Sequence, residues 1–174
     1  MPGPEGYSSA VNLGIDFGTT RTVVAYADRG NYPVVAFDDE AGDSFDWFPS
    51  VVAARGDELR FGWSALAVEG DRAWTQARSF KRLLAGAAAD GAVDLGGRSF
   101  AIAALVTRFL EALHHALRSR SSLGPALREV VSPRAVVATP ANAFCTQRFV
   151  TLDAFRRAGF DVRAMLAEPS APGF

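Results

Sequence analysis

Residues 13–25 restrict the possible folds of this chain more than any other stretch. They read as an apolar strand, a tight polar turn and a second apolar strand. Asp16 lies where the first strand ends, and Gly18 lets the backbone bend without a Cβ clash. Turn N–H groups, together with the hydroxyls of Thr19 and Thr20, can form an anion-binding concavity. A carboxylate beside a phosphate requires a cation between them, and Mg²⁺ is the usual one. The turn therefore predicts a Mg-nucleotide site, and an ordinary polar hairpin is an equal alternative at this point.

Length and composition bound the class of protein. The 174 residues suffice for one compact core or one lobe of a larger domain, and the net charge of −1 does not favour nucleic acid as a partner. The single cysteine, Cys145, excludes an internal disulfide and fits a reducing compartment. Residues 1–10 read as a flexible leader without the apolar core of a signal peptide, and no apolar run reaches transmembrane length. We expect a cytoplasmic protein without a membrane partner.

Hydrophobic periodicity predicts the order of the elements. Apolar runs and turn signals predict strands at 11–17, 22–28, 32–37, 50–54, 58–62, 134–139 and 162–166. Helical spacing predicts helices at 64–69, 77–84, 99–118 and 145–158, with a surface loop over 86–97. Ser99 is the expected N-cap of the long third helix, and Gly159 the residue that ends the fourth.

This order predicts an α/β fold with a mixed five-stranded sheet flanked by helices. The first three strands form an antiparallel meander, whereas the later β-α-β step is a parallel crossover. Residues 11–39 and 99–174 form the core subdomain, and residues 40–98 form a smaller α+β subdomain inserted into it. Asp16 ends the first strand and Glu168 follows the last. If these strands are parallel, both carboxylates converge on one cleft at the carboxyl ends of the strands.

Six short motifs then occur in the order and spacing of one family. They are Gly-Ile-Asp-Phe-Gly-Thr-Thr at 14–20, Pro-Ser-Val-Val-Ala at 49–53, Lys-Arg-Leu-Leu at 81–84, Val-Val-Ala-Thr-Pro-Ala at 136–141 with Gln-Arg at 147–148, the residues Asp-Ala, Arg and Ala-Gly within 153–159, and Glu-Pro-Ser-Ala at 168–171. The chain resembles the first lobe of the nucleotide-binding domain of the heat-shock protein 70 (DnaK-like) chaperones. More widely, it is similar to the actin-like ATPase superfamily, whose lobes have a ribonuclease H-like fold.

The resemblance implies an ATPase that uses ATP/ADP and Mg²⁺, with a role for each matching residue. Asp16 would hold Mg²⁺, mainly through water, and Gly18, Thr19, Thr20 and Arg21 would contact the phosphates. Lys81 would reach the γ-phosphate and the attacking water, and Glu168 would be the proton acceptor, so that the catalytic set is Lys81, Glu168 and Asp16. Pro140 and Arg148 would form the interlobe switch.

The sequence also departs from the family pattern. Trp47 and Phe48 replace the usual threonines before Pro49, and the loop after Lys81 is shorter than usual. The resemblance covers the first lobe, so we expect the second lobe and any peptide-binding domain to lie outside this sequence. We expect the lobe alone to bind ATP weakly and to turn it over negligibly.

In the intact protein, the resemblance implies a chaperone for protein folding in the stress response. Its nucleotide state would control the binding of unfolded polypeptides, with co-chaperones as further partners. Two alternatives of the same superfamily remain. One is a sugar or metabolite kinase, and the other is an actin-like filament protein.

Overall fold

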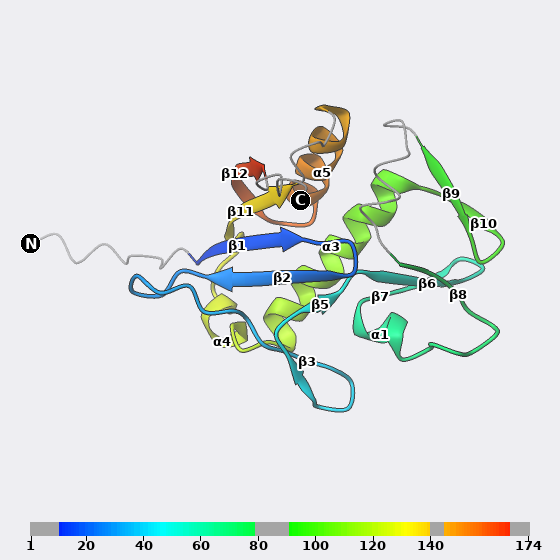
Figure 1. Ribbon diagram of the computed structural model, residues 1–174, viewed down its shortest axis with the longest axis horizontal. Coiled ribbons are helices and arrows are strands. Elements are labelled where there is room, and N and C mark those ends of the chain that lie inside the picture. Colours follow the sequence, from blue (N-terminus) through cyan, green and yellow to red (C-terminus); the bar gives the residue numbers. More distant parts are fainter. Residues whose placement is uncertain (1–10, 79–90, 140–144, 168–174) are drawn as a thin grey trace, which may run out of the picture.

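The computed structural model describes residues 11–78, 91–139 and 145–167 (Figure 1). The predicted leader, 1–10, lies outside the described residues. The helices are α1 (Trp63–Leu66), α3 (Ile102–Ser119), α4 (Gly124–Leu127) and α5 (Cys145–Arg157). The strands are β1 (Asn12–Phe17), β2 (Arg21–Tyr26), β3 (Phe37–Asp38), β4 (Ser44–Phe45), β5 (Phe48–Pro49), β6 (Val51–Arg55), β7 (Glu58–Phe61), β8 (Thr75–Arg78), β9 (Ala92–Leu95), β10 (Arg98–Ala101), β11 (Arg134–Thr139) and β12 (Asp161–Ala167).

The fold is mixed α/β, built on a mixed five-stranded sheet with the strand order β12-β11-β1-β2-β5. Strand β1 runs parallel to β11, and β11 runs parallel to β12. Strand β2 is antiparallel to both β1 and β5. The carboxyl ends of β1, β11 and β12 therefore share one edge of the sheet, as Figure 1 shows for β1 and β11. The predicted mixed five-stranded sheet flanked by helices is confirmed.

One face of this sheet is covered by α3 and α5. Along β1, Leu13, Ile15 and Phe17 are buried, and the alternate residues are exposed, as expected for a strand with one covered face. The Phe17 ring stacks on Phe109 of α3 at 5.7 Å and meets Phe155 of α5 edge-on at 6.2 Å. The apolar stripe predicted for α3 is buried at every position, namely Ile102, Leu105, Val106, Phe109, Leu113 and Leu117.

The third sheet strand differs from the prediction. Residues 32–37 were expected to pair fully with β2, but they make a single isolated bridge there, between Ala25 and Val34. The Pro33 carbonyl accepts a hydrogen bond from the Tyr26 N–H. Because Pro33 has no N–H to donate in return, this segment cannot continue a regular ladder with β2. The place beside the far end of β2 belongs to β5, which pairs Phe48 with Thr22.

Two helix predictions are also corrected. The first two residues of the predicted helix at 77–84 belong to β8, where Ala77 pairs with Val52, and residues 79–84 lie outside the described residues. The helix expected from Ser99 begins at Ile102, because Ser99 lies in the β9–β10 hairpin. That hairpin turns through two glycines with positive φ, at 96 and 97, which are the last two residues of the predicted surface loop.

Most of the remaining predicted elements are confirmed to within a few residues. Strand β11 has the predicted bounds, and α5, β12, β6, β7 and α1 lie where expected. Gly159, with φ 93°, ends α5 as predicted. In the proposed insertion, β6 is buried on both faces: Val52 and Ala54 join the main core, while Val51 and Ala53 pack with Ala65 and Trp74. The division into two subdomains stays a prediction.

Candidate functional site

The turn between β1 and β2 is closed so tightly that it requires glycine. Phe17 pairs with Thr22 across the hairpin, and the Gly18 N–H donates to the Asp16 carbonyl at 3.0 Å. A Cβ added to Gly18 would lie 2.2 Å from the Arg21 carbonyl oxygen, much closer than any real contact. Because the opposing atom is backbone, a side chain at position 18 cannot be accommodated without moving the start of β2.

Asp16 and Arg21 leave the hairpin from the same face of the sheet. Asp16 is exposed, between the buried residues Ile15 and Phe17, so it points away from the helices. It pairs with Val23, and Arg21, two residues earlier along β2, therefore shares its face. Thr19 and Thr20 are exposed in the turn between them. Asp16 and Arg21 therefore leave the sheet at the carboxyl end of β1, on the face opposite α3, with the two exposed threonines in the turn between them.

The segment that contains β5 holds this turn from the side. The Ser50 N–H donates to the Thr20 carbonyl at 3.1 Å, and Arg21 pairs with Pro49. The hydroxyls of Thr22 and Ser50 share a hydrogen bond of 3.0 Å, and both residues are almost fully buried. The backbone of the turn is therefore fixed by residues from a distant part of the sequence.

The Arg21 guanidinium lies over the indole of Trp47, 4.5 Å from the ring centroid. The structure explains how the two meet. Arg21 pairs with Pro49, and Trp47 lies two residues before Pro49, so its side chain is on the same face of the strand. In the sequence, Trp47 is a departure from the family pattern and has no expected role. An aromatic residue two positions before a strand that pairs with the turn is the signal that could have identified it.

The other predicted site residues fall into two groups. Lys81, Pro140 and Glu168 lie outside the described residues. Pro140 and Glu168 directly follow β11 and β12, whose register with β1 places Ala138 and Leu166 level with Asp16. The expectation that the first and last strands are parallel is confirmed. The proposed convergence of Asp16 with Glu168 stays a prediction.

Arg148 lies on α5, and its guanidinium donates to the Met165 carbonyl of β12 at 3.4 Å. This contact ties the helix to the sheet beside the edge where β11 ends. Among the described residues, Arg148 does not contact the Gly18 turn. The proposed role of Arg148 in an interlobe switch stays a prediction.

The two adjacent histidines of α3, His114 and His115, lie outside this site. His115 is exposed, whereas His114 is half-buried against the Phe160 ring at 4.9 Å. Burial, together with the nearby Arg118 guanidinium, lowers the pKa of His114, against a raising hydrogen bond to Ala158. The neutral imidazole accepts a hydrogen bond from Arg118 at 3.3 Å.

Within the described ranges, no helix is long and apolar enough to cross a membrane. These ranges also hold no group of three or more His, Cys, Asp or Glu side chains that could ligate a metal. No family model matches the chain.

Proposed function

We propose that this chain is the first lobe of a cytoplasmic Mg-ATPase of the actin-like fold, related to the heat-shock protein 70 chaperones. The observation that carries the proposal is the group at the carboxyl end of β1. There Asp16 and Arg21 leave one face of the sheet on either side of a glycine turn with two exposed threonines. The order of the six sequence motifs is independent support.

The chemistry of these residues suits a metal-bound polyphosphate. The hydroxyls of Thr19 and Thr20 and the Arg21 guanidinium supply donors for phosphate oxygens. Asp16 supplies a carboxylate for Mg²⁺, which keeps most of its waters and binds few protein ligands when a phosphate is present. Phosphoryl transfer depends mainly on such positioning and charge neutralisation.

Hydrolysis requires two further residues in this proposal, Lys81 and Glu168. The parallel order of β1, β11 and β12 supports a shared site, because Glu168 follows the strand whose end is level with that of β1. Lys81 would neutralise the γ-phosphate and Glu168 would accept the proton of the attacking water. Pro140, at the end of β11, would transmit the nucleotide state to the rest of the protein together with Arg148.

The test is MgATP turnover by the intact gene product, with and without an unfolded polypeptide, beside its Lys81→Ala variant. We expect slow turnover that the polypeptide stimulates and the variant loses. Arg108→Ala is a matched control, because Arg108 is an exposed cation on the solvent side of α3. Turnover unaffected by Lys81→Ala would contradict the role of this lysine.

Other outcomes separate the related classes. Turnover that requires a small hydroxylated acceptor would replace the chaperone with a sugar or metabolite kinase. Light scattering that rises with protein concentration in the presence of ATP would indicate a filament protein. Absence of MgATP binding by the intact gene product would reject the nucleotide site itself.

A further inference from the structure

Three aromatic side chains from separate elements pack together beside the Gly18 turn. Phe45 ends β4, Trp47 precedes β5, and Trp63 begins α1. The Trp63 ring lies 4.6 Å from Phe45 and 4.9 Å from Trp47, and Phe45 meets Trp47 at 5.6 Å. Each ring therefore contacts the other two. We call these three residues the aromatic triad.

Packing within the triad restricts the movement of each ring. Trp47 is held by two rings and by the β2–β5 pairing that follows it, so its indole has little freedom to turn. Trp63 keeps its place although its buried Nε1 N–H finds no hydrogen-bond partner within the described residues. A buried unpaired donor is costly, so ring packing offsets that cost here.

Arg21 rests on this rigid surface. Its guanidinium is 4.5 Å from the Trp47 centroid, and no carboxylate among the described residues makes an ion pair with it. When a planar guanidinium stacks on an indole, its N–H groups point outward in a plane parallel to the ring. They therefore remain available to an anion. An exposed arginine would otherwise lose side-chain entropy when it binds phosphate.

We propose that the aromatic triad is a positioning platform that pre-orients Arg21 for a polyphosphate at the Gly18 turn, with Trp47 as its contact residue. The inference rests on the proposed function and assigns residues that the sequence motifs do not. Trp47 acts through Arg21, so it is a positioning residue and does not itself touch the ligand.

The test is a double-mutant cycle on the full chain, with Mg²⁺-tripolyphosphate as the probe and calorimetric affinity as the readout. Trp47→Leu should weaken binding about 2–5-fold, the loss of an exposed cation–π contact. Arg21→Gln should weaken it about 10-fold or more, since a charged donor is lost. The effect of Trp47→Leu should vanish in the Arg21→Gln background, because the platform then has no guanidinium to position.

Further variants distinguish positioning from general stability. Trp47→Phe keeps a ring and should retain most of the affinity, whereas Arg21→Lys keeps the charge but loses planar stacking and should resemble Trp47→Leu. Arg29→Gln, in the other hairpin of β2, is the matched control and should leave affinity unchanged. Heteronuclear relaxation of Arg21 Nε gives a second readout, with an ordered guanidinium in the wild type and a mobile one in Trp47→Leu.

Two results would overturn the inference and leave the proposed function intact. One is wild-type affinity in Trp47→Leu. The other is an equal loss on Trp47→Leu with and without Arg21, which would mean that Trp47 acts through the fold. A wild-type chain that binds neither Mg²⁺-tripolyphosphate nor MgATP would reject both the platform and the proposed function.

Discussion

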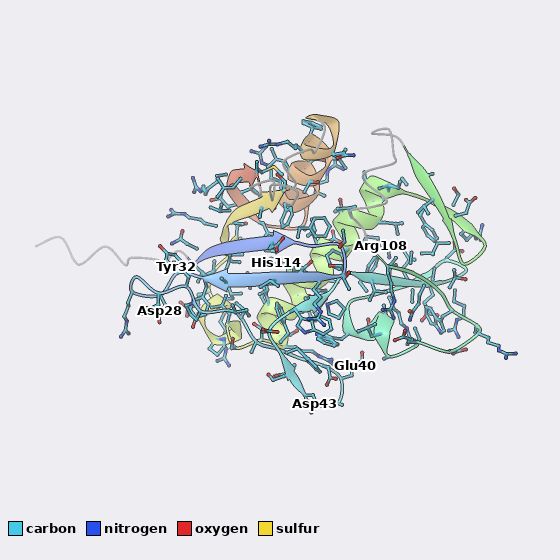
Figure 2. All side chains as sticks on the ribbon, in the orientation of Figure 1. Asp28, Tyr32, Glu40, Asp43, Arg108 and His114 are labelled. Atoms are coloured by element: carbon cyan, nitrogen blue, oxygen red, sulfur yellow. The ribbon has the colours of Figure 1, made fainter. Side chains whose placement is uncertain are left out.

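At one end of β2 the chain turns through Gly18, Thr19 and Thr20, and at the other it turns through Asp28–Asn31 (Figure 2, where Asp28 marks the second turn). Both turns are polar, contain a glycine and have an arginine close to it. Arg21 directly follows the first turn, and Arg29 directly precedes Gly30 in the second. In the second turn, a Cβ on Gly30 would meet nothing within 4 Å, and the Arg29 side chain is 94% exposed. That turn is closed by its own backbone, with Asp28 and Asn31 exchanging two hydrogen bonds.

The first turn is held by residues from elsewhere in the chain. Ser50 binds both the Thr20 carbonyl and the Thr22 hydroxyl, and Trp47 holds the Arg21 side chain. A polar loop that serves solubility alone needs no such support, because its own hydrogen bonds suffice. The comparison therefore favours a binding role for the first turn and the ordinary-hairpin interpretation for the second.

The largest expected difference between the turns follows from adding one methyl group. Gly18→Ala forces a Cβ against the Arg21 carbonyl, and we expect it to cost about 3 kcal/mol, the upper end for overpacking. Gly30→Ala meets no atoms but keeps a positive φ of 88°, at a cost of about 1 kcal/mol. Urea denaturation of both variants measures the difference. Equal losses would mean that the first turn relaxes as freely as the second.

A buried hydroxyl provides the next contrast. Thr22→Val leaves the Ser50 hydroxyl without its partner in a buried place, at an expected cost of about 1–3 kcal/mol. Thr19→Val changes an exposed hydroxyl, so stability should move by less than about 0.5 kcal/mol, while binding of MgATP weakens. Thermal melts with and without MgATP separate the two effects. A neutral Thr22→Val would show that the clamp by Ser50 is dispensable.

The smallest effect is a pH dependence that leaves both turns untouched. The pKa of His114 is lowered from 6.5 by burial first and by Arg118 second, so the unfolded chain binds this proton more readily than the folded one. The contribution of His114 to stability should therefore be fully present above about pH 6.5. It should be lost as the pH falls from 6.5 through the lowered pKa of the folded state. His114→Gln should flatten this part of the profile, and exposed His115→Gln should not. An unchanged profile in His114→Gln would refute the assignment.

The sheet could be predicted from the sequence where hydrophobic alternation and turn signals agree. Strand β11 and the hairpin of β1 and β2 satisfy both, and α3 has its whole predicted stripe buried. The start of α3 could not be placed, because Ser99 resembles an N-cap, but a tertiary hairpin recruits it first. The Gly96–Gly97 pair was the available signal for that hairpin.

Pairing between distant segments was the harder part. The segment 32–37 has strand-like composition, yet Pro33 interrupts its ladder with β2, and the two-residue β5 takes the neighbouring place. A strand of two residues is too short to show the alternation of apolar and polar side chains that identifies a strand from sequence. For the site, the positions of Asp16 and Gly18 were predictable from the turn, whereas the platform under Arg21 depends on where Trp47 and Trp63 meet in space.

The most direct test of the central claim is the Mg²⁺ dependence of ATP binding by this chain in the wild type, Asp16→Asn and Asp28→Asn. The two substitutions remove the same charge at opposite ends of the same hairpin pair. We predict that the wild type binds ATP weakly and requires Mg²⁺ to do so. Asp16→Asn should lose most of the affinity together with the Mg²⁺ requirement, whereas Asp28→Asn should behave like the wild type. Equal affinity in all three, or binding that ignores Mg²⁺ in the wild type, would contradict a metal-phosphate site at the turn after β1.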